Sequence, residues 1–319
     1  MPIVRFFTGV TPEMAERLIR HAPPDYTVTT HPSNLPDEEK MPLVSNADFV
    51  IIFGGGLSES VLRVAKKLKL IQLVSAGFEH INIDLCKELG IQVANNGGAN
   101  AIDVAEHTIA LILGFYRHMV EQDHNVRTNR YRTLNNGLIT YTIHDKKVGV
   151  IGMGNIGRRV TKLLNAFGAT VQYTDAYPSS PEVERDLSIT RVDLPTLLKT
   201  SDIVTLHVPY SKNTHHLIGP NELALIKSKA LLVNTCRGGV IDQKALTETL
   251  QNNRILGAAL DVLEPEPPDP NDPILKLDNV LLTPHSAGVT FDTWSRRGEF
   301  VFQNLQAVWQ GHAPQALVS

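Results

Sequence analysis

The sequence predicts an α/β protein made of two doubly wound parallel-sheet units. Short apolar runs alternate with helical patterns from one end of the chain to the other. That alternation is typical of parallel strands joined by helices that cover both faces of a sheet. It starts again near residue 147 with a glycine-rich turn that the first half lacks. A chain of 319 residues is also too long for one typical core and sufficient for two.

Four apolar runs in the first half have the character of strands, at 3–7, 49–53, 70–74 and 91–94. Helical patterns separate these runs, near 12–20, 58–67 and 82–89. Strand-like runs in the second half are expected at 148–151, 171–174, 203–206, 231–234, 258–260 and 280–282. Both halves therefore predict a β-α repeat with its own parallel sheet.

Three further segments lie outside these repeats. The stretch 101–119 is helical in pattern and apolar on more than one face, so it should be buried on more than one side. It either links the two units or forms a contact between two copies of the chain. The proline-rich segment 264–270 can be neither helix nor central strand and must be a stiff loop. The helical stretch 291–310 follows the last strand, and we expect it to pack back on the first unit.

The composition is that of an ordinary globular protein, with 42% apolar and 20% charged residues. A net charge of −3 gives no electrostatic reason to expect nucleic acid or an anionic membrane as partner. The two cysteines, Cys86 and Cys236, cannot form a disulfide framework and match no zinc motif, so we expect no metal. The chain shows no signal-peptide pattern and no apolar run of membrane-spanning length. We therefore expect a cytoplasmic protein.

A glycine motif follows the strand at 148–151 and consists of Gly152, Met153, Gly154, Asn155, Ile156 and Gly157. Gly152 would permit a tight turn, Gly154 would let the backbone approach a phosphate, and Gly157 would allow close packing of helix and strand. The helix N-terminus that follows offers N–H groups and the positive end of a dipole. The motif predicts a site for the pyrophosphate of a dinucleotide. An ordinary structural turn is the alternative.

The residues after the motif favour a dinucleotide site and help to distinguish NAD from NADP. A helical pattern at 158–167 ends at Gly168, where a C-terminal cap belongs. The strand at 171–174 then ends in Asp175, 18 residues after Gly157, near the spacing at which a carboxylate binds the adenosine ribose hydroxyls. A carboxylate repels the 2′-phosphate of NADP, and no arginine follows directly, so NAD is favoured. A solvated strand end is the alternative for Asp175.

Three strand ends of the second unit carry residues suited to nicotinamide chemistry. Such a reaction needs a proton donor or acceptor and a cation for substrate charge, and in an open α/β sheet these groups follow the carboxyl ends of strands. The candidates are Arg237, which two glycines follow, then Asp261 with Glu264 and Glu266, and finally His285. A guanidinium binds a carboxylate with two hydrogen bonds. Taken singly, Arg237 could be a surface residue of a turn and His285 a structural histidine.

Seven segments together resemble the NAD-dependent D-isomer-specific 2-hydroxyacid dehydrogenases, a family that includes glyoxylate and hydroxypyruvate reductases and D-lactate, formate and phosphoglycerate dehydrogenases. The segments are 75–78, 104–107, 148–157, 206–209, 234–242, 259–267 and 283–288. The resemblance implies a flavodoxin-like substrate domain at 1–99 plus 290–319 and a Rossmann NAD-binding domain at 100–289. It also implies a cleft between them that closes on substrate, and a homodimer with 100–118 as its arm.

The resemblance implies roles for individual residues. Arg237 binds the carboxylate and carbonyl oxygen of the substrate, and His285 is the acid/base. Glu266, which matches the family motif where Glu264 does not, orients His285 and keeps it protonated near neutral pH. Backbone N–H groups at Ala76 and Gly77, after Ser75, receive the substrate carboxylate.

The cofactor is expected to contact the glycine motif and several strand ends. By the resemblance, Val208 and Pro209 line the adenine pocket, and Asp261 with the backbone near Thr235 holds the nicotinamide amide. The full set beyond the glycine motif is Asp175, His207, Val208, Pro209, Thr214, Thr235, Cys236, Asp261, His285, Ala287 and Gly288. Cys236 is expected to be a packed neighbour of Arg237 rather than a nucleophile, because the chemistry needs no thiolate.

The sequence narrows the substrate to a small 2-oxo or 2-hydroxy acid. The loop at 54–57, Gly-Gly-Gly-Leu, brings no arginine or lysine that could bind a phosphate, so glyoxylate, hydroxypyruvate or pyruvate is favoured. Phosphite dehydrogenases of this framework carry a lysine where this chain has Ala76, which argues against phosphite. A phosphoglycerate dehydrogenase is a further alternative, although the regulatory extension of many of them is not found. A non-enzymatic NAD-sensing protein of the same fold is the alternative from another functional class.

Overall fold

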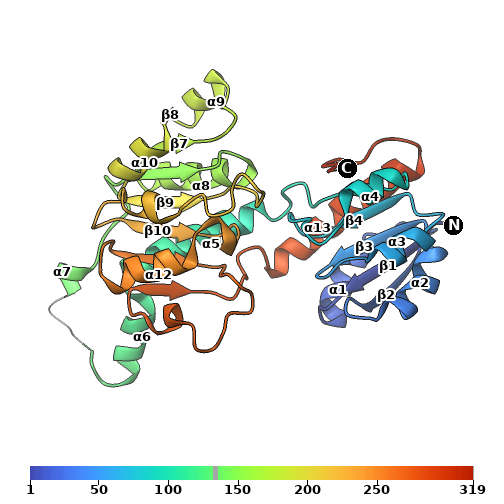
Figure 1. The fold of residues 1–319 in the computed structure, drawn as a ribbon, viewed down its shortest axis with the longest axis horizontal. Coiled ribbons are helices and arrows are strands. Elements are labelled where there is room, and N and C mark those ends of the chain that lie inside the picture. The colour runs from blue at the N-terminus through green and yellow to red at the C-terminus, as the bar shows by residue number, and fades with distance from the viewer. Residues whose placement is uncertain (132–135, 319) are drawn as a thin grey trace. The chain divides into compact units, whose positions relative to one another are not determined.

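The computed structural model describes residues 1–131 and 136–318. Backbone contacts divide the chain into two compact units (Figure 1). Unit 1 comprises Met1–Asn100 and Val289–Ser319, and unit 2 comprises Ala101–Gly288. Each junction lies one residue from the boundary expected from the sequence.

Unit 1 is built on a five-stranded parallel sheet with the strand order β2-β1-β3-β4-β5. Its strands are β1 (Ile3–Thr8), β2 (Thr27–Pro32), β3 (Phe49–Phe53), β4 (Leu70–Leu73) and β5 (Gln92–Ala94). Its helices are α1 (Pro12–Ile19), α2 (Asp37–Ser45), α3 (Glu59–Val64), α4 (Ile83–Glu88) and α13 (Phe291–Trp309). This order is the flavodoxin-like one, so the predicted fold class is confirmed for this unit.

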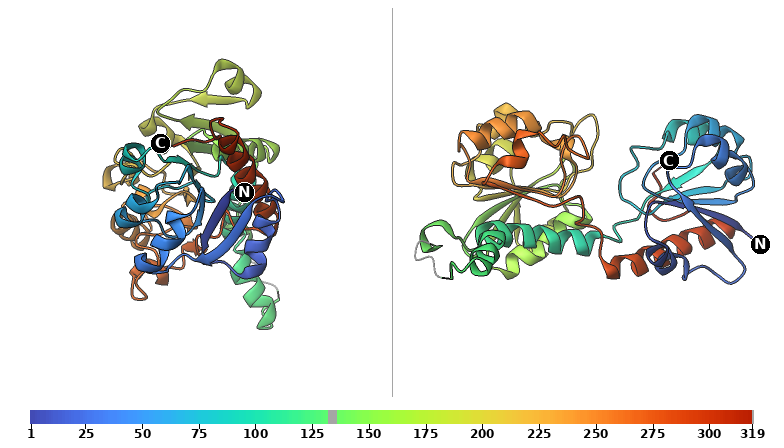
Figure 2. Two further views of the ribbon diagram at one scale, coloured as in Figure 1. Left: turned by 90° about the vertical axis from the view of Figure 1, so that its right-hand side faces the viewer. Right: turned by 90° about the horizontal axis from the view of Figure 1, so that it is seen from below.

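The helix α13 returns to unit 1 and packs against α1 and β4 (Figure 2). Its buried face includes Trp294, Val301, Phe302 and Leu305, which share one apolar cluster with residues of β1 and β3. Gly298 allows the close approach to α1, because a Cβ there would overlap the backbone of Leu18. Burial of this face explains the helical periodicity of the segment 291–310.

Unit 2 is built on a seven-stranded parallel sheet with the order β12-β11-β10-β9-β6-β7-β8. Its strands are β6 (Lys147–Ile151), β7 (Thr170–Thr174), β8 (Ile189–Arg191), β9 (Ile203–Leu206), β10 (Leu231–Asn234), β11 (Gly257–Leu260) and β12 (Val280–Leu282). Its helices are α5 (Ala101–Tyr116), α6 (Met119–Arg127), α7 (Asn136–Ile139), α8 (Asn155–Ala166), α9 (Pro181–Asp186), α10 (Leu194–Thr200), α11 (Pro220–Leu223) and α12 (Gln243–Gln251). The order reverses between β6 and β9, and ligands of doubly wound folds bind at such a point.

The apolar character of α5 is explained by burial inside unit 2. The helix packs against α8 and against β10, β11 and β12. It ends at Tyr116 rather than at 119, since His118 has a left-handed backbone (φ 49°) and α6 begins at Met119. Hydrophobicity over 100–118 is therefore no evidence for a contact between two chains.

Two strands and several helices were not expected from the sequence. The strands β2 and β8 lie at sheet edges and are partly exposed, so neither shows a continuous apolar run. The helix α2 contains Pro42, which weakens a helical pattern. The segment 264–270 forms neither helix nor strand, as predicted, and both cysteines are free and buried. No helix in the described part of the chain is long and apolar enough to cross a membrane.

Candidate active site

The glycine turn between β6 and α8 has the geometry that its sequence predicts. Gly152 has a positive φ of 96°, a conformation that favours glycine. A Cβ on Gly157 would overlap the carbonyl oxygen of Gly152, so helix and strand approach closely there. In contrast, a Cβ on Gly154 would meet no atom of the described residues within 4 Å, and none of their side chains caps the start of α8. This open cradle fits the pyrophosphate of NAD.

The two glycines allow a matched test of this cradle. Gly157→Ala should lower the free energy of unfolding by about 1–3 kcal/mol, because the methyl group overpacks the turn. Gly154→Ala should change stability by less than about 1 kcal/mol. It should instead weaken NADH binding about tenfold, since the methyl group occupies the cradle. Thermal melts and NADH fluorescence titrations measure both effects, and equal effects of the two variants on NADH binding would contradict the assignment.

Asp175 lies beside the glycine turn. Its Oδ2 accepts a hydrogen bond from the Met153 N–H at 2.6 Å, and its Oδ1 accepts one from the Tyr177 N–H at 2.9 Å. The guanidinium of Arg191 donates to the backbone carbonyl of Asp175 at 3.1 Å. Arg191 lies 16 residues after Asp175 in the sequence, and the pairing of β7 with β8 brings it there.

His207 is the first residue after β9 and is held in its neutral form. Burial lowers its pKa to about 3, and its Nε2 lies 2.9 Å from the Thr205 hydroxyl. Its Nδ1 is buried and has no hydrogen-bond partner among the described residues. Its carbonyl oxygen lies against Gly152. An unsatisfied buried nitrogen at this edge of the cradle is consistent with a bound cofactor, because buried polar atoms are otherwise nearly always paired.

His285 and Glu266 form a hydrogen-bonded pair at the carboxyl edge of the sheet. The His285 Nδ1 lies 2.7 Å from the Glu266 Oε2, and the Leu263 N–H donates to the other Glu266 oxygen at 3.1 Å. Burial by itself raises the pKa of Glu266. The hydrogen bond and charge of His285, the Leu263 amide and the Arg237 charge together hold that pKa below its ordinary value. Glu266 is therefore an anion beside the His285 imidazole.

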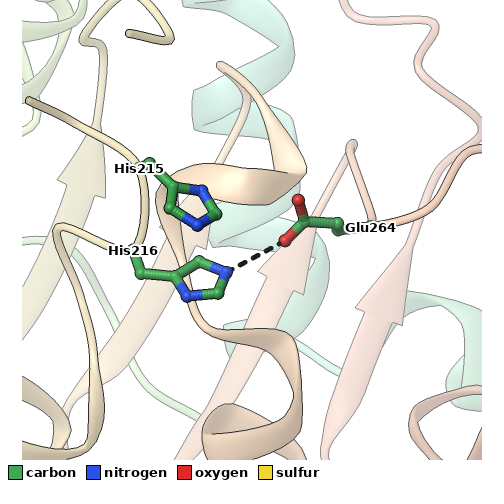
Figure 3. Close-up of side chains that lie close together, drawn as sticks. All are labelled: His215, His216 and Glu264. Atoms are coloured by element: carbon green, nitrogen blue, oxygen red, sulfur yellow. Dashed lines mark hydrogen bonds and ion pairs between the residues drawn. The ribbon is translucent and has the colours of Figure 1, made fainter. Parts of the chain in front are cut away.

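The other glutamate of this loop has a different partner. The Glu264 Oε2 lies 3.2 Å from Nε2 of His216 (Figure 3). Both glutamates lie in one loop and both precede a proline, and only Glu266 also follows one. The fold decides that Glu266 is the residue beside His285.

Asp261 fixes the loop that carries His285. It is 1% exposed, and its carboxylate accepts hydrogen bonds from the Thr283 hydroxyl at 2.6 Å and from the Ser286 and Ala287 N–H groups at 2.9 Å. Its backbone carbonyl accepts the His285 N–H at 2.7 Å. Asp261, which the sequence predicted to hold the nicotinamide amide, thus fixes the loop that carries His285.

His107 is part of the same network and was not among the predicted site residues. Its Nε2 lies 3.0 Å from the Thr283 hydroxyl and 3.5 Å from the Asp261 carboxylate. Because that hydroxyl donates to Asp261, it accepts from His107. The segment 104–107, one of those that resemble the family, ends in His107 and could have indicated this residue.

Arg237 follows β10, and the backbone around it is tightly held. The Asn234 side-chain amide donates to the Arg237 carbonyl at 2.9 Å and accepts the Cys236 N–H at 3.0 Å. A Cβ on Gly238 would overlap the Leu263 carbonyl, so this glycine permits the two neighbouring loops to approach. One Arg237 nitrogen donates to the Cys236 carbonyl at 2.7 Å. These contacts orient a guanidinium whose charge reaches Glu266.

Cys236 is packed rather than reactive. It is 8% exposed, and burial raises the pKa of its thiol to about 11 although the nearby Arg237 charge opposes this. The Sγ donates to the Asn234 side-chain oxygen. A thiol that stays protonated is a poor nucleophile.

A cavity of about 390 Å³ adjoins the His285–Glu266 pair. Apolar side chains provide most of its wall, namely Leu263, Pro267, Pro268, Leu275, Leu282 and Pro284. This wall forms an apolar surface on one side of the pair. A low local polarity strengthens the electrostatic interaction between imidazole and carboxylate.

The remaining cofactor candidates lie at the same edge of unit 2. The Thr214 hydroxyl donates to the Pro209 carbonyl at 2.6 Å, which closes the loop after Val208. The Thr235 hydroxyl lies 3.1 Å from that of Thr108 on α5. Ala287 is buried, and Gly288 ends the unit.

The predicted carboxylate-binding residues belong to unit 1. The Ser75 hydroxyl donates to the Gly77 carbonyl at 3.0 Å, and the Ala76 carbonyl accepts from the Asn95 side chain at 3.0 Å. These bonds define a turn after β4. A small cavity of about 50 Å³ opens beside it, lined by Ile52, Gly54, Gly55, Leu73, Ser75, Gly77, Phe78, His80 and Ile81. Its wall contains neither lysine nor arginine.

Comparisons with known proteins agree with this geometry. A family described as D-isomer specific 2-hydroxyacid dehydrogenase, NAD binding domain, matches residues 109–287. A glyoxylate reductase of Korarchaeum cryptofilum is 34% identical over 315 residues, covering 97% of this chain and 95% of the relative. A hydroxypyruvate reductase of Thermotoga maritima is 34% identical over 85% of this chain and 89% of the relative. The NAD-complexed D-isomer specific 2-hydroxyacid dehydrogenase of Lactobacillus delbrueckii ssp. bulgaricus has a TM-score of 0.82 at 27% identity, covering 99% and 100% of the two chains.

Proposed function

The chain belongs to the D-isomer-specific 2-hydroxyacid dehydrogenase family, and from that premise we propose that it reduces a small 2-oxo acid such as glyoxylate or hydroxypyruvate with NADH. It is an NAD-dependent oxidoreductase of 2-hydroxy acids. The observation that carries the proposal is the 2.7 Å bond between His285 and Glu266, at the edge of the sheet that also holds Arg237 and the glycine turn.

The mechanism assigns a separate task to each residue. The glycine turn at 152–157 and Asp175 would hold NADH, which would supply the hydride for the carbonyl carbon of the 2-oxo acid. His285, protonated beside the Glu266 carboxylate, gives its proton to the carbonyl oxygen. Arg237 binds the substrate carboxylate and stabilises the negative charge that grows on that oxygen. In the oxidation of a D-2-hydroxy acid the same imidazole accepts the proton.

We assign substrate binding to unit 1 and cofactor binding to unit 2. The backbone N–H groups at Ala76 and Gly77 would receive the substrate carboxylate. Support for a small, uncharged substrate side chain comes from the cavity beside this turn, whose wall includes Gly54 and Gly55 but neither lysine nor arginine. Phosphite is disfavoured as a substrate, because this chain has Ala76 where phosphite dehydrogenases of this framework carry a lysine.

The decisive assay follows the loss of NADH absorbance with a panel of glyoxylate, hydroxypyruvate, pyruvate, larger 2-oxo acids and 3-phosphohydroxypyruvate. The proposal expects turnover with the first two and a lower kcat/KM with the phosphorylated acid. Preference for the phosphorylated acid would overturn the substrate assignment. Binding of NADH without turnover on any acid would favour an NAD-sensing protein.

Asp175 should determine the preference for NADH. Asp175→Ala removes hydrogen-bond acceptors for the ribose and the charge that repels a 2′-phosphate. The ratio of kcat/KM with NADPH to that with NADH should rise about tenfold or more, because a hydrogen bond to a charged group contributes about 1.5–3 kcal/mol. Parallel assays with the two cofactors measure the ratio. Arg191→Ala in the same background should reduce the gain, and an unchanged ratio in Asp175→Ala would rule out this role.

The Glu266 charge should set the alkaline limit of reduction. Its pKa is held below the ordinary value, so Glu266 is ionised throughout the neutral range and places a negative charge beside the His285 imidazole. Glu266→Gln keeps the shape and removes the charge. The alkaline limb of the kcat/KM profile for reduction should move to lower pH by about one unit or more. A profile of kcat/KM against pH measures this, and an unshifted limb would show that Glu266 acts only through geometry.

We also propose that the protein is a homodimer that assembles through α6 and α7. Exposed apolar side chains gather on these two helices, namely Met119, Val120, Val126, Leu138 and Ile139. The helices extend away from the sheet of unit 2 (Figure 1), and exposed apolar patches mark interaction surfaces. Light scattering should give twice the mass of one chain, and Val120→Glu should shift it toward the mass of a single chain.

A cytoplasmic location is proposed on the chemistry of the cysteines. Cys86 and Cys236 are both free and buried, which suits a reducing compartment. Fractionation of the source cells with an antibody to the protein tests this location. Recovery with a membrane or secreted fraction would contradict it.

A further inference from the structure

Two histidines and a glutamate of unit 2 lie together outside the proposed catalytic residues (Figure 3). His215 and His216 are on the loop between β9 and α11, and Glu264 is on the loop after β11. One possible ligand atom from each residue lies within 4.8 Å of the other two. Within residues 1–131 and 136–318, no other three His, Cys, Asp or Glu side chains meet in this way.

The spacing of His216 and Glu264 suits two ligands of one metal ion. The His216 Nε2 lies 3.2 Å from the Glu264 Oε2. Zn²⁺ bonds to nitrogen and oxygen of about 2.0–2.2 Å, arranged tetrahedrally, separate two ligand atoms by roughly 3.4 Å. The pair needs little movement to bind an ion. Both side chains are 38% exposed, so an ion can enter from solvent and keep bound water.

The backbone turns His215 toward the same ion position. Side chains of adjacent residues in an extended segment point to opposite sides. Here His216 has a left-handed backbone, with φ of 49°, and its N–H donates to the Gly239 carbonyl at 2.8 Å. As a result the two imidazoles stack with their centroids 3.8 Å apart and their planes 26° apart, and both lie on the side of Glu264 (Figure 3).

Tyr210 completes the arrangement. Its hydroxyl lies 3.1 Å from Nδ1 of His215, which leaves the Nε2 of that ring for an ion. Metal-bound histidines almost always donate their other ring N–H to an oxygen, which fixes the ring orientation and tautomer. Tyr210 is in position to accept that hydrogen bond.

We propose that His215, His216 and Glu264 form a binding site for Zn²⁺ or a similar divalent transition-metal ion. Two imidazoles and one carboxylate are a donor set that suits Zn²⁺ and disfavours Mg²⁺, which prefers oxygen ligands. A bound ion would join the loop after β9 to the loop that carries Glu266. The site is separate from the residues assigned to hydride transfer, so its test requires no turnover.

The test uses protein without a histidine tag, treated with EDTA and desalted. Calorimetric titration with ZnCl₂ should show one ion bound per chain, and Co²⁺ should give visible absorption bands of a nitrogen- and oxygen-ligated ion. MgCl₂ at the same concentrations should give no binding signal. His215→Ala, His216→Ala and Glu264→Gln should each weaken Zn²⁺ binding about tenfold or more, and Tyr210→Phe about tenfold.

His144→Ala is the matched control. Its imidazole also lies near a carboxylate, with Nε2 3.5 Å from the Asp145 Oδ2, but no third ligand completes that pair. This variant should bind Zn²⁺ like the parent protein. Circular dichroism melts show which variants fold. If His216→Ala does not fold, His215→Ala and Tyr210→Phe still test the site. Absence of Zn²⁺ binding, unchanged binding in the folded site variants, or equal loss in His144→Ala would each overturn the proposal.

Discussion

His285→Ala should lower kcat for the reduction of a 2-oxo acid by about 10²–10⁴-fold, the usual contribution of a positioned general acid. The variant loses the imidazole that is hydrogen-bonded to Glu266. Steady-state rates of NADH oxidation measure the change. Because His285 lies at the end of a loop that Asp261 holds through backbone contacts, the fold should be retained.

Two controls separate loss of chemistry from loss of structure in this variant. NADH affinity from fluorescence titration should stay within a few-fold of the parent value, since the glycine turn is untouched. His312→Ala removes an exposed histidine of unit 1 and should leave kcat unchanged. Near-normal turnover of a folded His285→Ala protein would refute the acid/base assignment.

Arg237→Ala should lower kcat/KM for the 2-oxo acid by about 10²–10³-fold, because it removes the cation expected at the developing oxyanion and the substrate carboxylate. NADH binding should not change, since the residues proposed to hold the cofactor remain in place. Initial rates over a range of substrate concentrations, together with NADH titration, measure the two effects separately.

Arg237→Lys is the informative companion variant. Lysine keeps the charge but cannot form two parallel hydrogen bonds with a carboxylate, so activity should recover only in part. Arg254→Ala, at an exposed position, should behave like the parent protein. A loss of NADH affinity in Arg237→Ala, with substrate binding intact, would contradict the proposed role.

Local chemistry explains which features of this protein are predictable. The glycine turn is encoded within a few residues, because Gly152 needs a positive φ and Gly157 needs a close contact one helical turn later. The strands at the centre of each sheet are continuous apolar runs, since both of their faces are buried. The edge strands β2 and β8 carry no such pattern and were missed for that reason.

Interactions between distant segments were not predictable in the same way. Arg191 reaches Asp175 only through the pairing of β8 with β7. From the sequence, the hydrophobic stretch that forms α5 could either link the two units or form a contact between two copies of the chain. Packing against α8 and three strands of its own unit accounts for its apolar faces without a second chain.

The sequence by itself determined the α/β class, the dinucleotide turn and the three strand ends that carry Arg237, Glu266 and His285. These follow from short-range requirements of backbone conformation and burial. The family resemblance assigned Glu266 to His285, but only the tertiary structure showed the 2.7 Å contact of that pair and the position of Glu264 beside His216. The two glutamates are chemically identical and two residues apart, so their roles depend on which neighbouring loop each side chain meets after the sheet has formed.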